Sequence, residues 1–221
     1  MTLFTGKLQE IEDVSSVVPP DEYVKIWEDV SKEVQERKAL NYRLTDEAKE
    51  KCFTELKRRP YYLTSIAERY GVKTIAEVGT AQGLQFYSFA HMLKKNDGKI
   101  WSCDIIDVRN KEYAEIYKDQ ATFCLGDSAN LKEAIKKEGQ KIDLFYIDGA
   151  HDYGDVIKDV FNLREVQSEN PIWIFDDFDQ RFGCYRDIEM LMENRDDVKI
   201  YRVGNAASGN PNHQVIVRGK Y

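Results

Sequence analysis

From residue 74 onward, short apolar runs alternate with segments of helical pattern, and this alternation is the strongest constraint on the fold. The runs are rich in β-branched and aromatic residues and lie at 74–78, 99–104, 121–125, 142–147 and 171–175. The helical segments lie between them, near 83–95, 112–118, 129–138 and 152–166. Such alternation is typical of right-handed βαβ units around a parallel sheet. The sequence therefore predicts an α/β, Rossmann-like fold with five parallel strands.

The two ends of the chain depart from this alternation. After a helix near 181–194, the runs 199–203 and 214–218 are separated by a loop of glycine, asparagine, serine and proline, which indicates a C-terminal antiparallel hairpin. Before the first strand, the pattern favours three helices, near 21–37, 45–57 and 62–70. Pro60 is expected to separate the last two.

This pattern divides the chain into two parts. We expect residues 1–64 to form a helical extension or cap, and residues 65–221 to form the main domain. The apolar stripes of the N-terminal helices are compatible with packing on their own sheet, with a lid or with a homo-oligomer interface.

Composition narrows the class of function. The formal net charge is −7, which disfavours nucleic acid and anionic membrane as partners, because phosphate contacts come from lysine and arginine. No apolar run approaches the length of a membrane span, and no signal segment is visible. The four cysteines have no paired spacing and are expected to be free thiols. A cytoplasmic enzyme acting on a small molecule is the expectation.

Carboxylates end four of the predicted strands. They are Glu77, Asp104, Asp148 and the pair Asp176 and Asp177. In an open α/β sheet the carboxyl ends of the strands line the ligand crevice. The acids are therefore expected to converge on one site, which favours a metal ion, a sulfonium group or the hydroxyls of a ribose.

The segment AEVGTAQG at 76–83 joins the first strand to a helix. Gly79 allows a tight turn, and Gly83 allows the helix start to approach the strand and a ligand closely. The GxxxG spacing differs from the GxGxxG of dinucleotide folds, which disfavours a dinucleotide oxidoreductase. An ordinary βα turn is the alternative, and the buried acid Glu77 just before the turn argues against it.

Two further acids follow the second and third strands. Asp104 is placed to accept hydrogen bonds from both ribose hydroxyls of a nucleoside, although a capping or solvated role is the alternative. Asp127, with Ser128 beside it, is placed either to accept from an adenine amino group or to cap the next helix.

The runs YIDGAHDY and FDDFD form a second group. Asp148, Asp176 and Asp177 end two strands expected to be neighbours, and three such carboxylates repel one another unless a cation lies among them. Mg²⁺ prefers oxygen ligands and would lower the pKa of a bound hydroxyl. His151, three residues after Asp148, is placed to act as the general base. A surface histidine near a helix start is the alternative.

These motifs resemble those of class I methyltransferases that use S-adenosylmethionine (SAM), over roughly residues 65–221. The D-G-x-H-x-Y run with the later D-D pair resembles a metal-dependent sugar O-methyltransferase subset of the methyltransferase 24 type, which includes macrocin O-methyltransferases and cephalosporin-hydroxylase-like proteins. The resemblance implies Asp148, Asp176 and Asp177 as metal ligands and His151 as the base. It implies cofactor contacts from Glu77, Gly79, Thr80, Gly83, Asp104, Asp127, Ser128 and Asp148. The middle glycine of the commonest motif is missing, and Ala81 stands near its place.

The expected function is transfer of a methyl group from SAM to a metal-bound hydroxyl of a sugar or other vicinal diol. One alternative is a metal-dependent hydrolase or hydroxylase-like enzyme on the same fold. The other is a non-catalytic nucleotide-binding module, which the intact set of aspartates and histidine disfavours.

Overall fold

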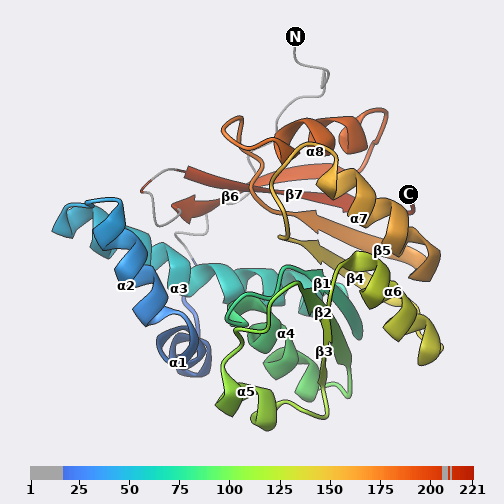
Figure 1. Cartoon of the computed structure of the whole chain (residues 1–221), viewed down its shortest axis with the longest axis horizontal. Helices are drawn as coiled ribbons and strands as arrows, with labels where there is room; N and C mark the ends of the chain where they lie inside the picture. Colours follow the sequence, from blue (N-terminus) through green and yellow to red (C-terminus); the bar gives the residue numbers. More distant parts are fainter. Residues whose placement is uncertain (1–16, 206–208, 210) are drawn as a thin grey trace.

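The computed structural model describes residues 17–205, 209 and 211–221. A mixed seven-stranded sheet forms the centre, with helices on both faces (Figure 1). The helices are α1 (Asp21–Val30), α2 (Lys32–Asn41), α3 (Asp46–Arg69), α4 (Leu84–Lys94), α5 (Lys111–Ile116), α6 (Ser128–Lys137), α7 (Asp155–Leu163), the 3-10 helix η2 (Arg164–Val166) and α8 (Cys184–Met192). The strands are β1 (Thr74–Val78), β2 (Lys99–Asp104), β3 (Ala121–Leu125), β4 (Ile142–Ile147), β5 (Gln167–Phe175), β6 (Val198–Asn205) and β7 (Pro211–Arg218).

The strand order is β3-β2-β1-β4-β5-β7-β6. The first five strands are parallel, and β7 pairs antiparallel with both β5 and β6. The predicted five parallel strands with a terminal antiparallel pair are therefore confirmed. The direction of chain winding reverses between β1 and β4, and a ligand crevice is expected outside the carboxyl ends of strands at such a point.

The sheet separates two apolar cores. On one face α1, α3, α4 and α5 pack over residues such as Ile75 and Tyr146, and on the other α6, α7 and α8 pack over residues such as Phe145 and Trp173. The register places Glu77 of β1 beside Ser102 of β2 and Tyr146 of β4. Since alternate residues of a strand share a face, these polar groups point toward the α3 and α4 side.

Helix α3 corrects the prediction of two helices separated at Pro60. It runs without interruption through Pro60, and Thr45 caps it by accepting a hydrogen bond from the Ala48 N–H at 3.2 Å. A proline inside a helix costs about 3 kcal/mol. Tyr62, Leu63 and Ile66 are buried after the proline, and burial of each such side chain contributes about 1.5–3 kcal/mol, which offsets that cost.

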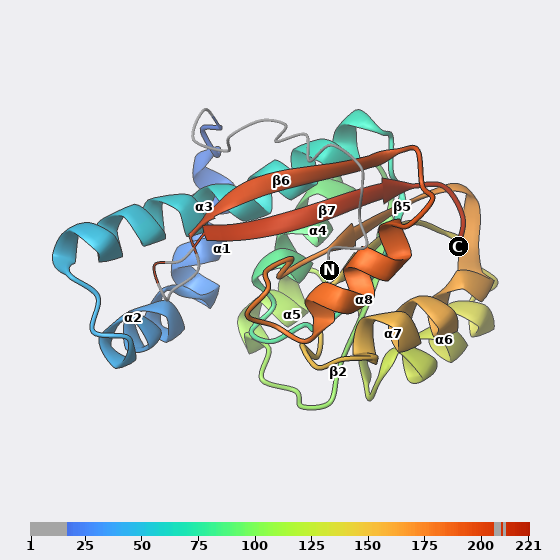
Figure 2. The same ribbon diagram turned by 90° about the horizontal axis from the view of Figure 1, so that it is seen from above.

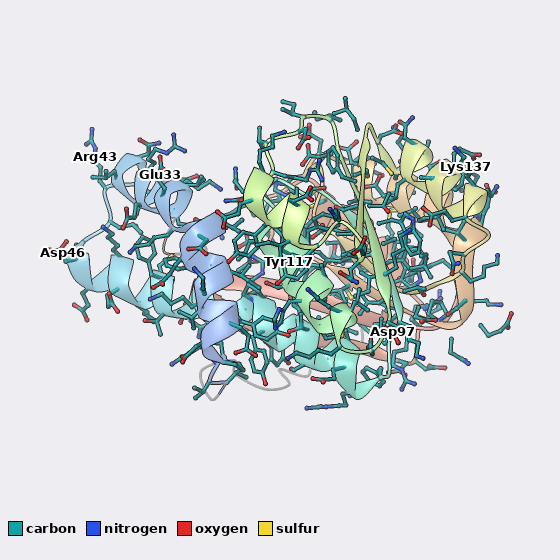
Figure 3. All side chains as sticks on the ribbon, turned by 90° about the horizontal axis from the view of Figure 1, so that it is seen from below. Glu33, Arg43, Asp46, Asp97, Tyr117 and Lys137 are labelled. Atoms are coloured by element: carbon teal, nitrogen blue, oxygen red, sulfur yellow. The ribbon has the colours of Figure 1, made fainter. Side chains whose placement is uncertain are left out.

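The predicted helix at 21–37 is divided by Ser31, which has φ −120°. Helix α1 packs into the core on one face of the sheet. Helix α2 and the first half of α3 project away beyond the edge of the sheet (Figure 2). The exposed side chains of Glu33, Arg43 and Asp46 lie at the end of this projection (Figure 3). Helix α3 crosses position 64, so the extension and the main domain share one helix. No helix in the described part of the chain is long and apolar enough to cross a membrane.

Candidate functional site

A cleft of about 830 Å³ opens at the carboxyl ends of the parallel strands. Its lining comes from the loop after β1, the ends of β2 to β5, and the N-terminal helices, including Ser31, Gln35 and Lys38. It contains most of the predicted site residues: Glu77, Gly79, Thr80, Asp104, Asp127, Ser128, Asp148, His151, Asp176 and Asp177. Gly83 is not part of the lining and is the N-cap residue of α4 instead.

The loop after β1 depends on two glycines with left-handed backbone. Gly79 has φ +93°, and its N–H donates to the Cys103 carbonyl oxygen at 2.9 Å. A Cβ atom at Gly79 would overlap with the backbone carbonyl of Asp148. Gly83 has φ +95°, and a Cβ there would overlap with the ring of Tyr87. Glycine is thus required at both positions, for close approach of β4 in one case and of α4 in the other.

Asp104 holds this loop in place. Its carboxylate accepts the Ala81 N–H at 2.9 Å and the Ile106 N–H at 3.2 Å. Ala81 itself has φ +46°, so an alanine adopts the left-handed conformation at the position where the commonest motif has glycine. The missing glycine therefore leaves the loop geometry intact.

Glu77 lies at the base of the cleft and is 1% exposed. The Ser102 hydroxyl donates to its Oε2 at 2.6 Å, and the Thr80 hydroxyl lies 2.5 Å from that of Ser102. Burial raises the pKa of Glu77 well above its ordinary value. No described lysine, arginine or histidine forms an ion pair with it. A buried acid with a raised pKa is suited to a cationic or hydrogen-bond-donating ligand.

Of the two roles predicted for Asp127, the structure confirms that of helix cap. It caps α6 by accepting from the Ala129 N–H at 3.0 Å and the Asn130 N–H at 3.4 Å, and it pairs with Lys158 at 2.9 Å. The hydrogen bond from Lys158 lowers the pKa of Asp127. Ser128 is fully buried and accepts from the Asn162 amide at 2.9 Å. Both residues line the cleft, so their cofactor contacts stay a prediction.

Asp148, His151 and Asp177 lie together at the ends of β4 and β5. His151 Nε2 is 2.9 Å from Asp177 Oδ2 and 3.9 Å from Asp148 Oδ1. The carboxylates of Asp148 and Asp177 raise the pKa of His151 to about 10. Burial and the neighbouring Asp176 raise the pKa of Asp148 to about 7. Without a bound cation, His151 is therefore protonated at neutral pH.

These three residues form a group suited to a metal ion. Their ligand atoms all lie within 4.8 Å of one another, and two carboxylates with one imidazole are a donor set that divalent cations accept. Asp176 is not part of this group. Its role as a third ligand stays a prediction.

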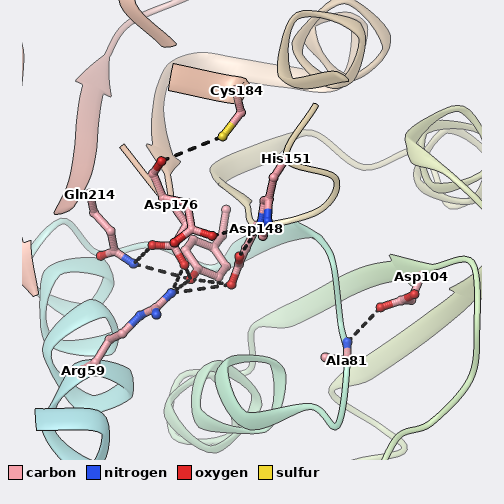
Figure 4. Close-up of polar contacts among 10 residues, drawn as sticks. Arg59, Ala81, Asp104, Asp148, His151, Asp176, Cys184 and Gln214 are labelled. Carbon is pink, nitrogen blue, oxygen red and sulfur yellow. Dashed lines mark hydrogen bonds and ion pairs between the residues drawn. The ribbon is translucent and has the colours of Figure 1, made fainter. Parts of the chain in front are cut away.

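Asp176 instead belongs to a buried network that the sequence analysis missed. Its Oδ2 pairs with Arg59 of α3 and accepts from the Tyr146 hydroxyl at 3.1 Å, and its Oδ1 accepts from the Gln214 amide at 3.2 Å (Figure 4). Burial alone would lower the pKa of Arg59, but the Asp176 carboxylate keeps it well above the ordinary value. Strand alternation was an available signal for Tyr146, two residues before Asp148, whereas no local signal marks Arg59.

Helix α8 positions the loop that carries His151. The Asp187 carboxylate, fully buried, accepts the N–H groups of Gly154, Val156 and Ile157 at the start of α7. The Cys184 N–H donates to the His151 carbonyl oxygen at 3.0 Å.

Replacing Asp187 with alanine is expected to lower the free energy of unfolding by about 2–4 kcal/mol, because several buried N–H groups lose a charged acceptor. Urea denaturation measures this. Asp152→Ala, an exposed acid in the same loop, is the control and is expected to change stability by less than about 0.5 kcal/mol. Equal stabilities for the two variants would contradict the role given to Asp187.

The chain is similar to a methyltransferase family and to solved O-methyltransferase structures. Residues 76–178 match a family described as a methyltransferase domain. A putative O-methyltransferase from Klebsiella pneumoniae is similar over 94% of both chains, with a TM-score of 0.63 and 12% identity. The O-methyltransferase TomG from Streptomyces achromogenes, involved in tomaymycin synthesis and solved with SAM, has a TM-score of 0.61 and 14% identity over 94% of this chain and 93% of that one.

An O-methyltransferase from Bacillus cereus, solved with SAH, has a TM-score of 0.59 and 15% identity over 93% of this chain and 94% of that one. Comparison with curated proteins gives no match. At such low identities the solved structures establish the fold, while the family match covers the segment from β1 to the end of β5. The chain therefore has the fold of these O-methyltransferases, and its residues 76–178 match the model of a methyltransferase-domain family.

Proposed function

We propose that the protein transfers the methyl group of SAM to a hydroxyl of a small molecule, a sugar or another vicinal diol. One observation carries this proposal: a single cleft contains the glycine loop with Glu77 and Asp104 at one end and the group of Asp148, His151 and Asp177 at the other. The methyltransferase-domain match and the similarity to O-methyltransferases solved with SAM or SAH support it.

The residues around the glycine loop fit SAM. Gly79 lets the loop after β1 pack directly against the Asp148 backbone, Glu77 offers a buried acid without a cationic partner among the described residues, and Asp104 offers carboxylate oxygens at the end of β2. When bound, SAM supplies an electrophilic methyl group on a sulfonium. The chain's own task is to hold the acceptor oxygen in line with that methyl group and to remove its proton.

Asp148, Asp177 and His151 are the residues for that task. Asp148 and Asp177 would hold a divalent cation such as Mg²⁺, which would lower the pKa of an acceptor hydroxyl. A cation that neutralised the two carboxylates would also remove the interactions that raise the pKa of His151. The imidazole would then return toward its ordinary pKa and accept the hydroxyl proton as a general base.

The same proposal covers the setting of the reaction. The net charge of −7 supports a small-molecule acceptor rather than nucleic acid or membrane, and the four free cysteines support a reducing, cytoplasmic location.

Calorimetric titration of SAM, in Mg²⁺ and again in EDTA, tests the proposal. Binding is expected in both conditions, because no hydrogen bond or ion pair among the described residues joins the side chains of Asp148, His151 or Asp177 to the loop at 79–83 or to Asp104. Asp104→Ala is expected to weaken SAM binding about tenfold or more, since the loop after β1 loses the hydrogen bond from the Ala81 N–H, the segment after β2 loses that from the Ile106 N–H, and the ribose loses an acceptor. The control is Asp107→Ala, which removes an acid three residues later that pairs with Arg109 and is not part of the lining. No SAM binding to the unaltered chain would refute the proposed function.

A further inference from the structure

Arg59 lies where two strand-end carboxylates and a phenol meet. Its Nη2 contacts Asp176 Oδ2 and the Tyr146 hydroxyl, and lies 3.5 Å from Asp148 Oδ2. The guanidinium comes from α3 and reaches over the ends of β4 and β5 (Figure 4). Its side chain is 17% exposed and that of Asp176 is 2% exposed, so the pair is largely removed from water.

The two oxygens of the Asp148 carboxylate face different partners. Its Oδ2 faces Arg59 and accepts from the Tyr146 hydroxyl at 3.0 Å, whereas its Oδ1 faces His151. The Asp176 carboxylate lies wholly on the Arg59 side, since its second oxygen accepts from Gln214. The Oδ2 atom of Asp177 faces His151, 2.9 Å from its Nε2.

We propose that Arg59 is an internal cation that occupies the position between Asp148 and Asp176, withholds Asp176 from metal coordination, and confines a divalent ion to Asp148 and Asp177, beside His151. Asp176 is then a positioning residue that acts through Arg59 and Tyr146. This inference rests on the metal-assisted part of the proposed function, and it changes the ligand set expected from the sequence.

Charge balance supports this role. A buried carboxylate is costly in free energy without a counter-ion. A guanidinium supplies that counter-ion from the chain itself, through hydrogen bonds of fixed geometry. Three carboxylates, one guanidinium, one neutral imidazole and one divalent cation sum to zero. Without Arg59 the same group would carry one uncompensated negative charge and would attract a cation more strongly.

The position of Arg59 in the chain adds a second consequence. It lies before residues 76–178, the segment that matches the methyltransferase family, and it reaches the site only because α3 packs along the sheet. The N-terminal helices therefore contribute a functional group to the site in addition to covering the sheet.

Mn²⁺ titration followed by electron paramagnetic resonance tests the inference without an activity assay. Arg59→Met is expected to tighten Mn²⁺ binding about tenfold or more, because Asp176 and Asp148 lose their counter-ion. Arg58→Met removes the same charge from the adjacent position of α3, outside the cleft lining, and is expected to leave affinity within about twofold. A merely structural role for Arg59 predicts no gain of affinity.

The aspartates separate the two ligand sets. Asp177→Asn removes a ligand and is expected to weaken Mn²⁺ binding at least about tenfold more than Asp176→Asn, which removes a charge but no ligand. The double variant R59M/D176N removes the internal pair together, avoids an unpaired buried charge and is expected to bind Mn²⁺ like the unaltered chain. Equal losses in Asp176→Asn and Asp177→Asn, or weaker binding by folded Arg59→Met, would overturn the inference.

Mn²⁺ binding and SAM binding, measured on the same variants, test this inference and the proposed function separately. Failure of Mn²⁺ to bind both the unaltered chain and Arg59→Met would overturn the inference while leaving SAM binding to decide the function. Failure of SAM to bind would refute the function, while the Mn²⁺ ranking would still decide the role of Arg59.

Discussion

Replacing His151 with alanine is expected to lower the turnover of methyl transfer by about 10²–10⁴-fold, the range that a positioned general base contributes. His151 lies beside both carboxylates suited to the cation, and no other described histidine lines the cleft. SAM affinity is expected to stay within about threefold, because the glycine loop, Glu77 and Asp104 are untouched. Release of S-adenosylhomocysteine with a panel of vicinal-diol acceptors measures turnover, and calorimetry measures SAM affinity.

The control for this variant is His91→Ala. His91 bonds through Nδ1 to the Tyr117 hydroxyl at 2.9 Å on α4 and is not part of the cleft, so its loss is expected to leave turnover unchanged. Added imidazole is expected to restore part of the activity of His151→Ala but not its full rate. Loss of SAM binding with turnover preserved at saturating SAM would show that His151 is not the base.

The strands of this fold follow closely from the sequence. The runs at 74–78, 99–104, 121–125 and 142–147 coincide with β1 to β4, because central parallel strands are buried on both faces and read as continuous apolar segments. Strand β5 begins at Gln167, earlier than the predicted run 171–175. The first four residues of the strand are half-buried or exposed. Such a segment carries no periodic apolar signal.

The helices were harder to predict where tertiary contacts decide the outcome. A proline normally ends a helix, yet α3 continues through Pro60 because its second half is buried against the sheet. The break at Ser31 is similar, since a single serine, although a favoured N-cap residue, does not by itself end a helix. Local propensity is a weak guide in both cases.

The sequence predicted that the acids of the candidate site would lie together, but it did not predict that Arg59 would join them. Carboxylates at strand ends converge because the topology brings those ends together, and the cleft contains them as expected. Asp176 and Asp177 lie beyond the last residue of β5, and Asp177 has φ +52°, so strand alternation did not predict that their side chains would face different partners. Arg59 lies 117 residues before Asp176, and only the packing of α3 on the sheet joins them.

Replacing Gly79 with alanine is expected to lower SAM affinity about tenfold or more, because forcing an extra methyl group into a close-packed contact costs about 1–3 kcal/mol and the loop must shift to relieve it. The backbone of Gly79 is fixed on both sides, by its hydrogen bond to Cys103 of β2 and by its contact with Asp148 after β4. An added Cβ would overlap with the Asp148 carbonyl, and the glycine loop would have to move away from the acids. The free energy of unfolding is expected to fall by about 2–4 kcal/mol as well.

Gly139→Ala separates this clash from backbone strain. Gly139 also has positive φ, +66°, but no atom lies within 4 Å of the position of a Cβ there. Alanine at Gly139 therefore carries only the strain of a left-handed residue, about 1 kcal/mol, and SAM affinity is expected to be unchanged. Calorimetry and urea denaturation of both variants measure the difference. If Gly79→Ala bound SAM as tightly as Gly139→Ala does, the approach of β1 to β4 at Asp148 would not be what shapes the cofactor end of the cleft.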